Sequence, residues 1–230
     1  MIENELIYDI KELVKSHKLS DDIDLSNRYI SYLLSNQRAL WIRKKYSEPG
    51  NLVNDSITQT LGAMELEVAD RSICPGIPAG CSILRTKEEI PNPVTVKGSE
   101  LITRVGPVDI LNYDFSYVPY ERAIYTGNGK YNQQQVFAFL LDNRIYIKTA
   151  NVQYKMLKYI NIRGVFEDPS IVTKYCDAQG NTCYDPATTN YPIERWMIPF
   201  VKEQVVNQLV QSAQMPKDQA NNANNNNTDR

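Results

Sequence analysis

The sequence predicts an α+β protein in which an N-terminal pair of helices and a C-terminal helix form a helical body. Helical periodicity at both ends, strand-like alternation in the middle and an asparagine-rich tail support this fold class. A chain of 230 residues is long enough to bury a core. We expect four parts: an N-terminal helical part (1–60), a β-rich insertion (61–170), a cysteine-bearing loop with the C-terminal helix, which packs against the N-terminal helices (171–215), and an extended tail (216–230).

The first helix is predicted at residues 3–16. Leu6, Ile10 and Val14 recur at the spacing of one helix face, and charged residues lie opposite. A polar connector rich in serine and aspartate follows at 19–24, and Ser26 or Asp24 can cap the next helix.

The second helix is predicted at residues 26–46, and its charge is one-sided. From 25 to 47 the chain has five basic residues and no acid: Arg28, Arg38, Arg43, Lys44 and Lys45. Three of them crowd the last turn, where cations complement the helix dipole. Two interpretations remain: a solvated face with a stabilised C-terminus, or a face that meets an acidic partner, such as a neighbouring subunit or a nucleic-acid backbone.

From residue 61 onward the pattern changes to strands and loops. Strands are predicted at 136–141, 144–149 and 159–166. The first two form a hairpin around Asp142-Asn143, because asparagine tolerates the left-handed turn position. In the second of these strands Arg144, Tyr146 and Lys148 alternate with isoleucines, so we expect that one face is wet.

The last helix is predicted at residues 193–213, with Val201, Val205 and Leu209 in one row. Pro199 either kinks this helix or marks its first turn. After Met215 the chain loses hydrophobicity, and six of the last ten residues are asparagine. We expect this tail to be disordered on its own, because it cannot offset its ordering entropy.

The composition favours a binding protein over an enzyme. The chain has 15 tyrosines but a single histidine, His17, so few groups titrate near neutrality. A net charge of −2 argues against coating nucleic acid. No apolar run is long enough to span a bilayer, and the acidic N-terminus lacks signal-peptide form. We expect a cytoplasmic origin with reduced cysteines, no membrane partner and no cofactor.

The four cysteines fall into two pairs of equal spacing, Cys74/Cys81 and Cys176/Cys183. Structural zinc sites usually have about two to four intervening residues in each pair, whereas here there are six. Free thiols are favoured over disulfides across hairpins, and both over zinc, so no metal ligand is assigned.

Adjacent acids are the remaining candidates for chemistry, at Asp21-Asp22, Glu88-Glu89 and Glu167-Asp168. Carboxylate catalysis needs convergent groups held by a scaffold, and a strand end before Pro169 is also what an ordinary turn looks like. The sequence contains no phosphate-binding loop or nucleophile motif. We therefore assign no catalytic residue.

Four strings carry a family resemblance: 24–30 (DLSNRYI), 34–44 (LSNQRALWIRK), 159–169 (YINIRGVFEDP) and 191–196 (YPIERW). They resemble a structural protein of crAss-like tailed phages, short-tailed viruses of gut bacteria, among the ring or head–tail connector proteins beneath the portal. The resemblance covers the first helical pair, the last strand and the final helix, and covers the middle loosely.

The resemblance implies a non-enzymatic virion subunit at the head–tail junction or in the tail, assembled in the host cytoplasm. It implies a ring of about twelve copies through which genomic DNA passes, in contact with the portal and other tail or ring proteins. We expect contacts at the basic helix end and the C-terminal segment: Arg38, Trp41, Arg43, Lys44, Lys45, Lys202 and Met215.

Three alternatives remain open. The first alternative is that the chain forms another layer of the same particle, as a tail or head-completion protein does. From other classes come a carboxylate-based tail hydrolase and a nucleic-acid binder acting through the basic helix.

Overall fold

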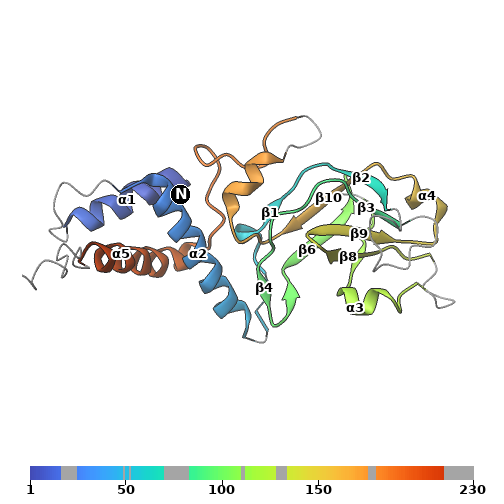
Figure 1. The fold of residues 1–230 in the computed structure, drawn as a ribbon, viewed down its shortest axis with the longest axis horizontal. Helices are drawn as coiled ribbons and strands as arrows, with labels where there is room; N and C mark the ends of the chain where they lie inside the picture. The colour runs from blue at the N-terminus through green and yellow to red at the C-terminus, as the bar shows by residue number, and fades with distance from the viewer. Residues whose placement is uncertain are drawn as a thin grey trace, which may run out of the picture.

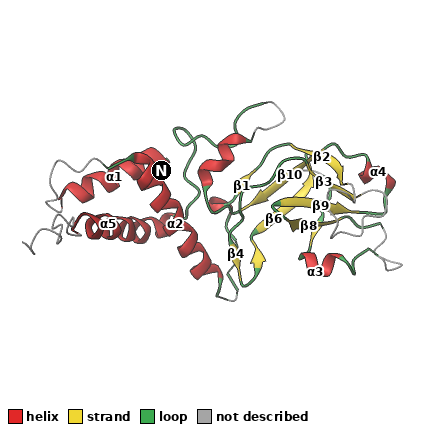
Figure 2. Ribbon diagram, in the orientation of Figure 1, coloured by secondary structure: helices red, strands yellow, loops and turns green. Residues whose placement is uncertain are grey.

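Helices gather at one end of the molecule and a curled sheet at the other (Figures 1 and 2). The computed structural model describes residues 1–16, 25–48, 50–51, 53–69, 83–109, 112–127, 134–175 and 180–214. The mixed α+β class predicted from the sequence is confirmed.

Three long helices pack together at the helical end: α1 (Glu3–Ser16), α2 (Asn27–Tyr46) and α5 (Ile198–Gln214). Each contributes one apolar face to a shared buried cluster that includes Leu6, Ile10, Ile30, Leu34, Val201 and Val205. Burying apolar side chains is the main stabilising contribution here, at roughly 1.5–3 kcal/mol for each large aliphatic residue.

The last helix starts later than predicted. Residues 195–197 form a short 3-10 helix (Arg195–Met197), and α5 begins at Ile198. Pro199 therefore lies in the first turn of α5, where a missing backbone N–H costs no intrahelical hydrogen bond. Of the two predicted roles for Pro199, the first-turn role is confirmed.

Within the described residues the sheet has eight strands. They are β1 (Gln59–Thr60), β2 (Met64–Ala69), β3 (Ile83–Thr86), β6 (Ile102–Pro107), β7 (Ser116–Tyr117), β8 (Phe137–Leu141), β9 (Arg144–Lys148) and β10 (Tyr159–Gly164). Strand β10 pairs with β1 and β2 along one edge and with β6 along the other. All pairings are antiparallel except that of β7 with β8.

The sheet curls around its own core. Strands β6 and β7 stand at opposite ends of the strand order, yet the Phe115 N–H, just before β7, donates to the Val105 carbonyl at 2.7 Å. The enclosed cluster includes Met64, Leu84, Val105, Ile145, Ile147, Ile160 and Ile162. This half-closed shape shields one face of each strand from water.

The predicted hairpin of β8 and β9 is confirmed, with Asp142 and Asn143 at φ 49° and 56°. The expectation that one face of β9 is wet is wrong at its centre, because Tyr146 is buried. It stacks on Phe139 at 5.4 Å in a small cluster on the outer face of the sheet, where α3 (Tyr120–Ala123) packs on β8.

Smaller elements complete the described chain. A two-stranded hairpin joins β4 (Thr95–Val96) to β5 (Ser99–Glu100), and α4 (Val152–Lys155) precedes β10. Two further 3-10 helices lie at Asp55–Ile57 and Pro169–Lys174. Within the described ranges, no helix has the length and apolar character that crossing a membrane requires.

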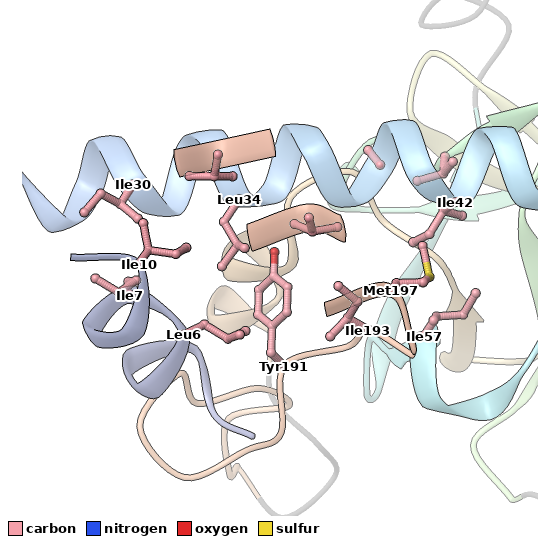
Figure 3. Close-up of a cluster of buried hydrophobic side chains, with 14 of the residues drawn as sticks. Leu6, Ile7, Ile10, Ile30, Leu34, Ile42, Ile57, Tyr191, Ile193 and Met197 are labelled. Carbon is pink, nitrogen blue, oxygen red and sulfur yellow. The ribbon is translucent and has the colours of Figure 1, made fainter. Parts of the chain in front are cut away.

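The two ends of the molecule share buried surface. The helical cluster includes Ile57 before the sheet, Val94 and Val96 at the β4–β5 hairpin, and Val165 after β10. Figure 3 shows Ile57 beside Ile42, Ile193 and Met197 at this junction. The helical end and the sheet are therefore joined by packing as well as by the chain.

Candidate interaction surface

The sequence predicts Arg38 as a contact on the basic helix, but its side chain has no exposed surface. Its guanidinium donates to three backbone carbonyls: Pro192 at 2.5 Å, Phe166 at 2.8 Å and Ile57 at 3.1 Å. Burial lowers the pKa of Arg38, and the ring of Tyr191 lies 5.9 Å from the guanidinium carbon. Arg38 is thus an internal connection between three segments, which removes it from the candidate contacts.

Arg43 is occupied within the chain by an ion pair with Glu167. Its side chain is 41% exposed, so this pair adds little stability by itself. The neighbouring acid, Asp168, accepts hydrogen bonds from the N–H and hydroxyl of Ser170 and caps the following 3-10 helix. Both carboxylates of the sequence candidate Glu167-Asp168 therefore have structural partners.

Three aromatic side chains meet where α2 crosses the start of α5. The ring centroids of Trp41 and Phe200 are 5.2 Å apart, and those of Trp196 and Phe200 are 6.3 Å apart. Trp196 and Phe200 remain 43% and 45% exposed, and Leu40 on α2 is 53% exposed. Both tryptophans of the chain thus lie at one partly exposed apolar surface.

Two lysines lie over these rings. The Lys44 Nζ is 5.0 Å from the Trp41 ring centroid, and the Lys45 Nζ is 5.7 Å from that of Trp196. Contacts of this kind contribute about 0.5–1 kcal/mol at exposed sites. Lys44 makes no ion pair with the residues that the structure describes, and Lys45 pairs loosely with Glu48 at 3.9 Å. We call the set Leu40, Trp41, Lys44, Lys45, Trp196 and Phe200 the aromatic–basic face.

Glu194 fixes the position of Trp196. Its carboxylate accepts a hydrogen bond from the Trp196 indole N–H at 2.5 Å and from the Tyr46 hydroxyl at 3.2 Å. Burial first, and the Glu194 charge second, raise the pKa of Tyr46, so this hydroxyl remains a donor at neutral pH. A half-exposed tryptophan is thereby held in one orientation before any partner arrives.

The remaining predicted contacts are divided between the described and undescribed parts of the chain. Lys202 pairs with Asp9 at 2.5 Å and joins α5 to α1. Met215 lies outside the described residues, as do His17, Asp21-Asp22 and the cysteines at 74, 81 and 176. Cys183 is half-buried against the core of the sheet, and its backbone N–H donates to the Tyr175 carbonyl at 2.9 Å. Among the residues that the structure covers, no group of three or more histidine, cysteine or carboxylate side chains has metal-site geometry.

Leu40, Trp196 and Phe200 are exposed residues of this face that the sequence pattern did not predict as contacts. One available signal was that Phe200 falls outside the row of Val201, Val205 and Leu209, which is buried. Another signal was the position of the two tryptophans: Trp41 lies near the end of the second predicted helix, and Trp196 lies near the start of the last one.

Comparisons with known proteins relate the chain to phage ring proteins. A family model described as phage tail ring protein 2 matches residues 5–228. The chain is also similar to ring protein 2 of Bacteroides phage crAss001, with 28% identity over 226 residues, which cover 97% of this chain and 96% of the relative.

Proposed function

Since the chain belongs to the phage tail ring protein 2 family, we propose that it forms one layer of an oligomeric ring connecting the portal to the tail. In this proposal the ring has about twelve copies and encloses the channel through which the genome passes. Membership of the family makes the chain a structural component of a crAss-like phage particle.

The observation that carries the proposal is the extent of the match to a named ring protein, which spans nearly all of both chains. The aromatic–basic face supports it, because a closed ring needs complementary surfaces on every copy. Half-exposed tryptophan and phenylalanine are typical of protein interfaces. In this proposal Trp41, Lys44 and Lys45 contact a neighbouring subunit, while Arg43, Lys202 and the segment reaching Met215 support or extend that contact.

A structural role also agrees with the contacts of Glu167 and Asp168, the strongest catalytic candidates in the sequence. Glu167 is paired with Arg43, and Asp168 caps a helix. In this proposal neither acts on a substrate. Turnover of peptidoglycan that disappears in a Glu167→Gln variant would identify a tail hydrolase instead.

The decisive experiment is electron microscopy of the full chain mixed with the portal ring of the same virus. We expect a symmetric layer added to the portal, with a copy truncated after Met215 adding it poorly. Absence of a layer with the full chain contradicts the connector role and leaves a tail or head-completion protein of the same particle.

Binding of nucleic acid is a second candidate, because Lys44 and Lys45 present charge beside aromatic rings. The burial of Arg38 and the pairing of Arg43 weaken it. It requires DNA binding that falls steeply with salt, and a smaller salt slope for Lys44→Ala.

A further inference from the structure

The aromatic–basic face is larger than the three rings alone. The exposed side of α2 continues from it through Asn36 and Tyr32, and Tyr32 is 61% exposed. Five exposed residues that recur at every fourth position of α2 include no acid: Arg28, Tyr32, Asn36, Leu40 and Lys44. An apolar and basic strip on one helix therefore lacks a counterpart within the described chain.

A surface of opposite character lies on the sheet end. An open hollow of about 510 Å³ is bounded by β5, the start of α3 and the β8–β9 turn. Its lining includes the acids Glu100, Glu121 and Asp142 and contains no basic residue. Pro119, Leu140 and Leu141, each half-buried, supply the smaller, apolar part of the lining. We call this the acid-lined hollow.

Two of these acids are free to meet a partner. Glu121 and Asp142 are exposed, and neither forms an ion pair with a described residue. Glu100 instead accepts a hydrogen bond from the Tyr117 hydroxyl at 3.1 Å. The hollow therefore offers two negative charges next to apolar walls, which matches two lysines beside aromatic rings.

The two surfaces are built by different elements, which are displaced from each other along the molecule. In Figure 1 the crossing of α2 and α5 lies on one side of β4, and α3 lies on the other. A surface pair that is complementary and displaced in this way suits a head-to-tail contact, in which every copy uses both surfaces.

We propose that the aromatic–basic face of one copy docks on the acid-lined hollow of the next copy. This inference rests on the ring function proposed above and specifies which surfaces form the contact between subunits. Lys44 and Lys45 meet Glu121 and Asp142, which sets the orientation, while Trp196, Phe200 and Leu40 lose their contact with water.

A second copy fits the face better than DNA does. A duplex offers phosphates to Lys44 and Lys45, but it gives no apolar cover to Leu40 and Phe200. The acid-lined hollow supplies both kinds of contact. Charge complementarity together with apolar walls thus favours the second copy.

Charge reversal in trans tests the proposal with the full chain. One variant carries Lys44→Glu and Lys45→Glu, and another carries Glu121→Lys and Asp142→Lys. We expect each variant alone to self-associate about tenfold or more weakly than the unaltered chain, because like charges then face each other. An equimolar mixture restores association, since each face then finds an opposite hollow. Sedimentation equilibrium measures all three samples.

A matched control carries Lys158→Glu and Lys174→Glu, the same charge change at exposed lysines outside both surfaces. It should associate like the unaltered chain. A mixture no stronger than either reversed variant overturns the proposal, as does unaltered association of those variants. So does a native chain that stays monomeric at about 1 mM, a concentration at which even a weak contact with a Kd of about 1 mM is half formed.

Cross-linking locates the contact directly. Full chains labelled with ¹⁵N are mixed with unlabelled chains and treated with a zero-length amine-to-carboxyl reagent. We expect peptide pairs of mixed isotope that join Lys44 or Lys45 to Glu121 or Asp142. Mixed pairs found only at other sites contradict the proposal.

Failure of the subunit contact and failure of the connector role give different results. If the association and cross-linking tests succeed but no layer forms on the portal, the subunit contact holds and the connector role fails.

Discussion

Arg38 joins three chain segments that lie far apart in the sequence. Its guanidinium donates hydrogen bonds to the carbonyls of Ile57, Phe166 and Pro192. Ile57 precedes the sheet, Phe166 follows the last strand, and Pro192 precedes the last helix. A buried arginine without a carboxylate partner is stable here because carbonyl dipoles replace the lost water. The residue therefore sets how the helical end meets the sheet.

Replacing Arg38 by Met is expected to lower the free energy of unfolding by roughly 3–5 kcal/mol, because buried carbonyls then lack a donor. Urea unfolding followed by circular dichroism measures the loss. Arg28→Met is the matched control on the same helix, where the exposed side chain should matter by less than about 0.5 kcal/mol. Equal midpoints for the two variants would show that Arg38 is not a structural connection.

Two buried tyrosines should respond differently to loss of the hydroxyl. The Tyr184 hydroxyl donates to the buried Glu3 carboxylate at 3.1 Å, and Glu3 also accepts from Ser31. Tyr184→Phe is expected to cost roughly 1–3 kcal/mol. The Tyr191 hydroxyl is buried without a hydrogen-bond partner among the described residues, so Tyr191→Phe should be neutral or stabilising. Comparing their urea midpoints checks the contrast, and an equal loss in both variants contradicts it.

The same tyrosines predict alkaline sensitivity. Burial raises the pKa of both Tyr184 and Tyr191 well above their ordinary value of about 10. Above pH 10 the unfolded chain releases these protons while the folded chain retains them, so stability is complete below pH 10 and falls as pH rises further. The Tyr184→Phe/Tyr191→Phe double variant should lose stability less steeply between about pH 9.5 and 11. Parallel slopes for the variant and the native chain exclude this origin.

At the scale of elements, β10 organises the sheet because it pairs with three strands. The register with β6 shifts between Arg163 and Gly164. A Cβ at Gly164 would lie 3.0 Å from the Leu101 carbonyl oxygen. That carbonyl accepts from the Val165 N–H at 2.9 Å, so the backbone is held close to the glycine.

Gly164→Ala should therefore destabilise the fold by about 1–3 kcal/mol through overpacking. The control is Gly106→Ala, whose Cβ would lie 3.0 Å from the Asp114 Oδ1. That carboxylate is 54% exposed and can rotate away, at the expense of its ion pair with Arg104. Thermal unfolding distinguishes the two, with the larger shift at Gly164. A larger shift at Gly106 would contradict this account of β10.

At the scale of the whole molecule, the shared cluster of Ile57, Val94, Val96 and Val165 predicts cooperative unfolding. Two parts that bury surface on each other and share Arg38 lose much of their stability when either part opens. Both tryptophans report on the helical end.

The urea transition seen by tryptophan fluorescence should coincide with that seen by hydrogen exchange in β8 and β9. Coincident transitions indicate one folding unit. A fluorescence transition at clearly lower urea would instead mean that the helical end opens independently. Val165→Ala, placed at the junction, should shift both probes together.

The sequence by itself determined the fold class, the bounds of α1 and the β8–β9 hairpin, because apolar periodicity and turn chemistry are local properties. The sequence also determined the family, because family membership is recognised from the order of residues along the chain. The tertiary structure decided which charged and aromatic side chains are buried, paired or exposed. Arg38, Arg43 and Lys44 share one short stretch of helix, yet the structure buries one, pairs one and leaves one exposed. Such outcomes depend on which distant segments pack nearby, and Trp196 joins Trp41 only because α5 folds back across α2.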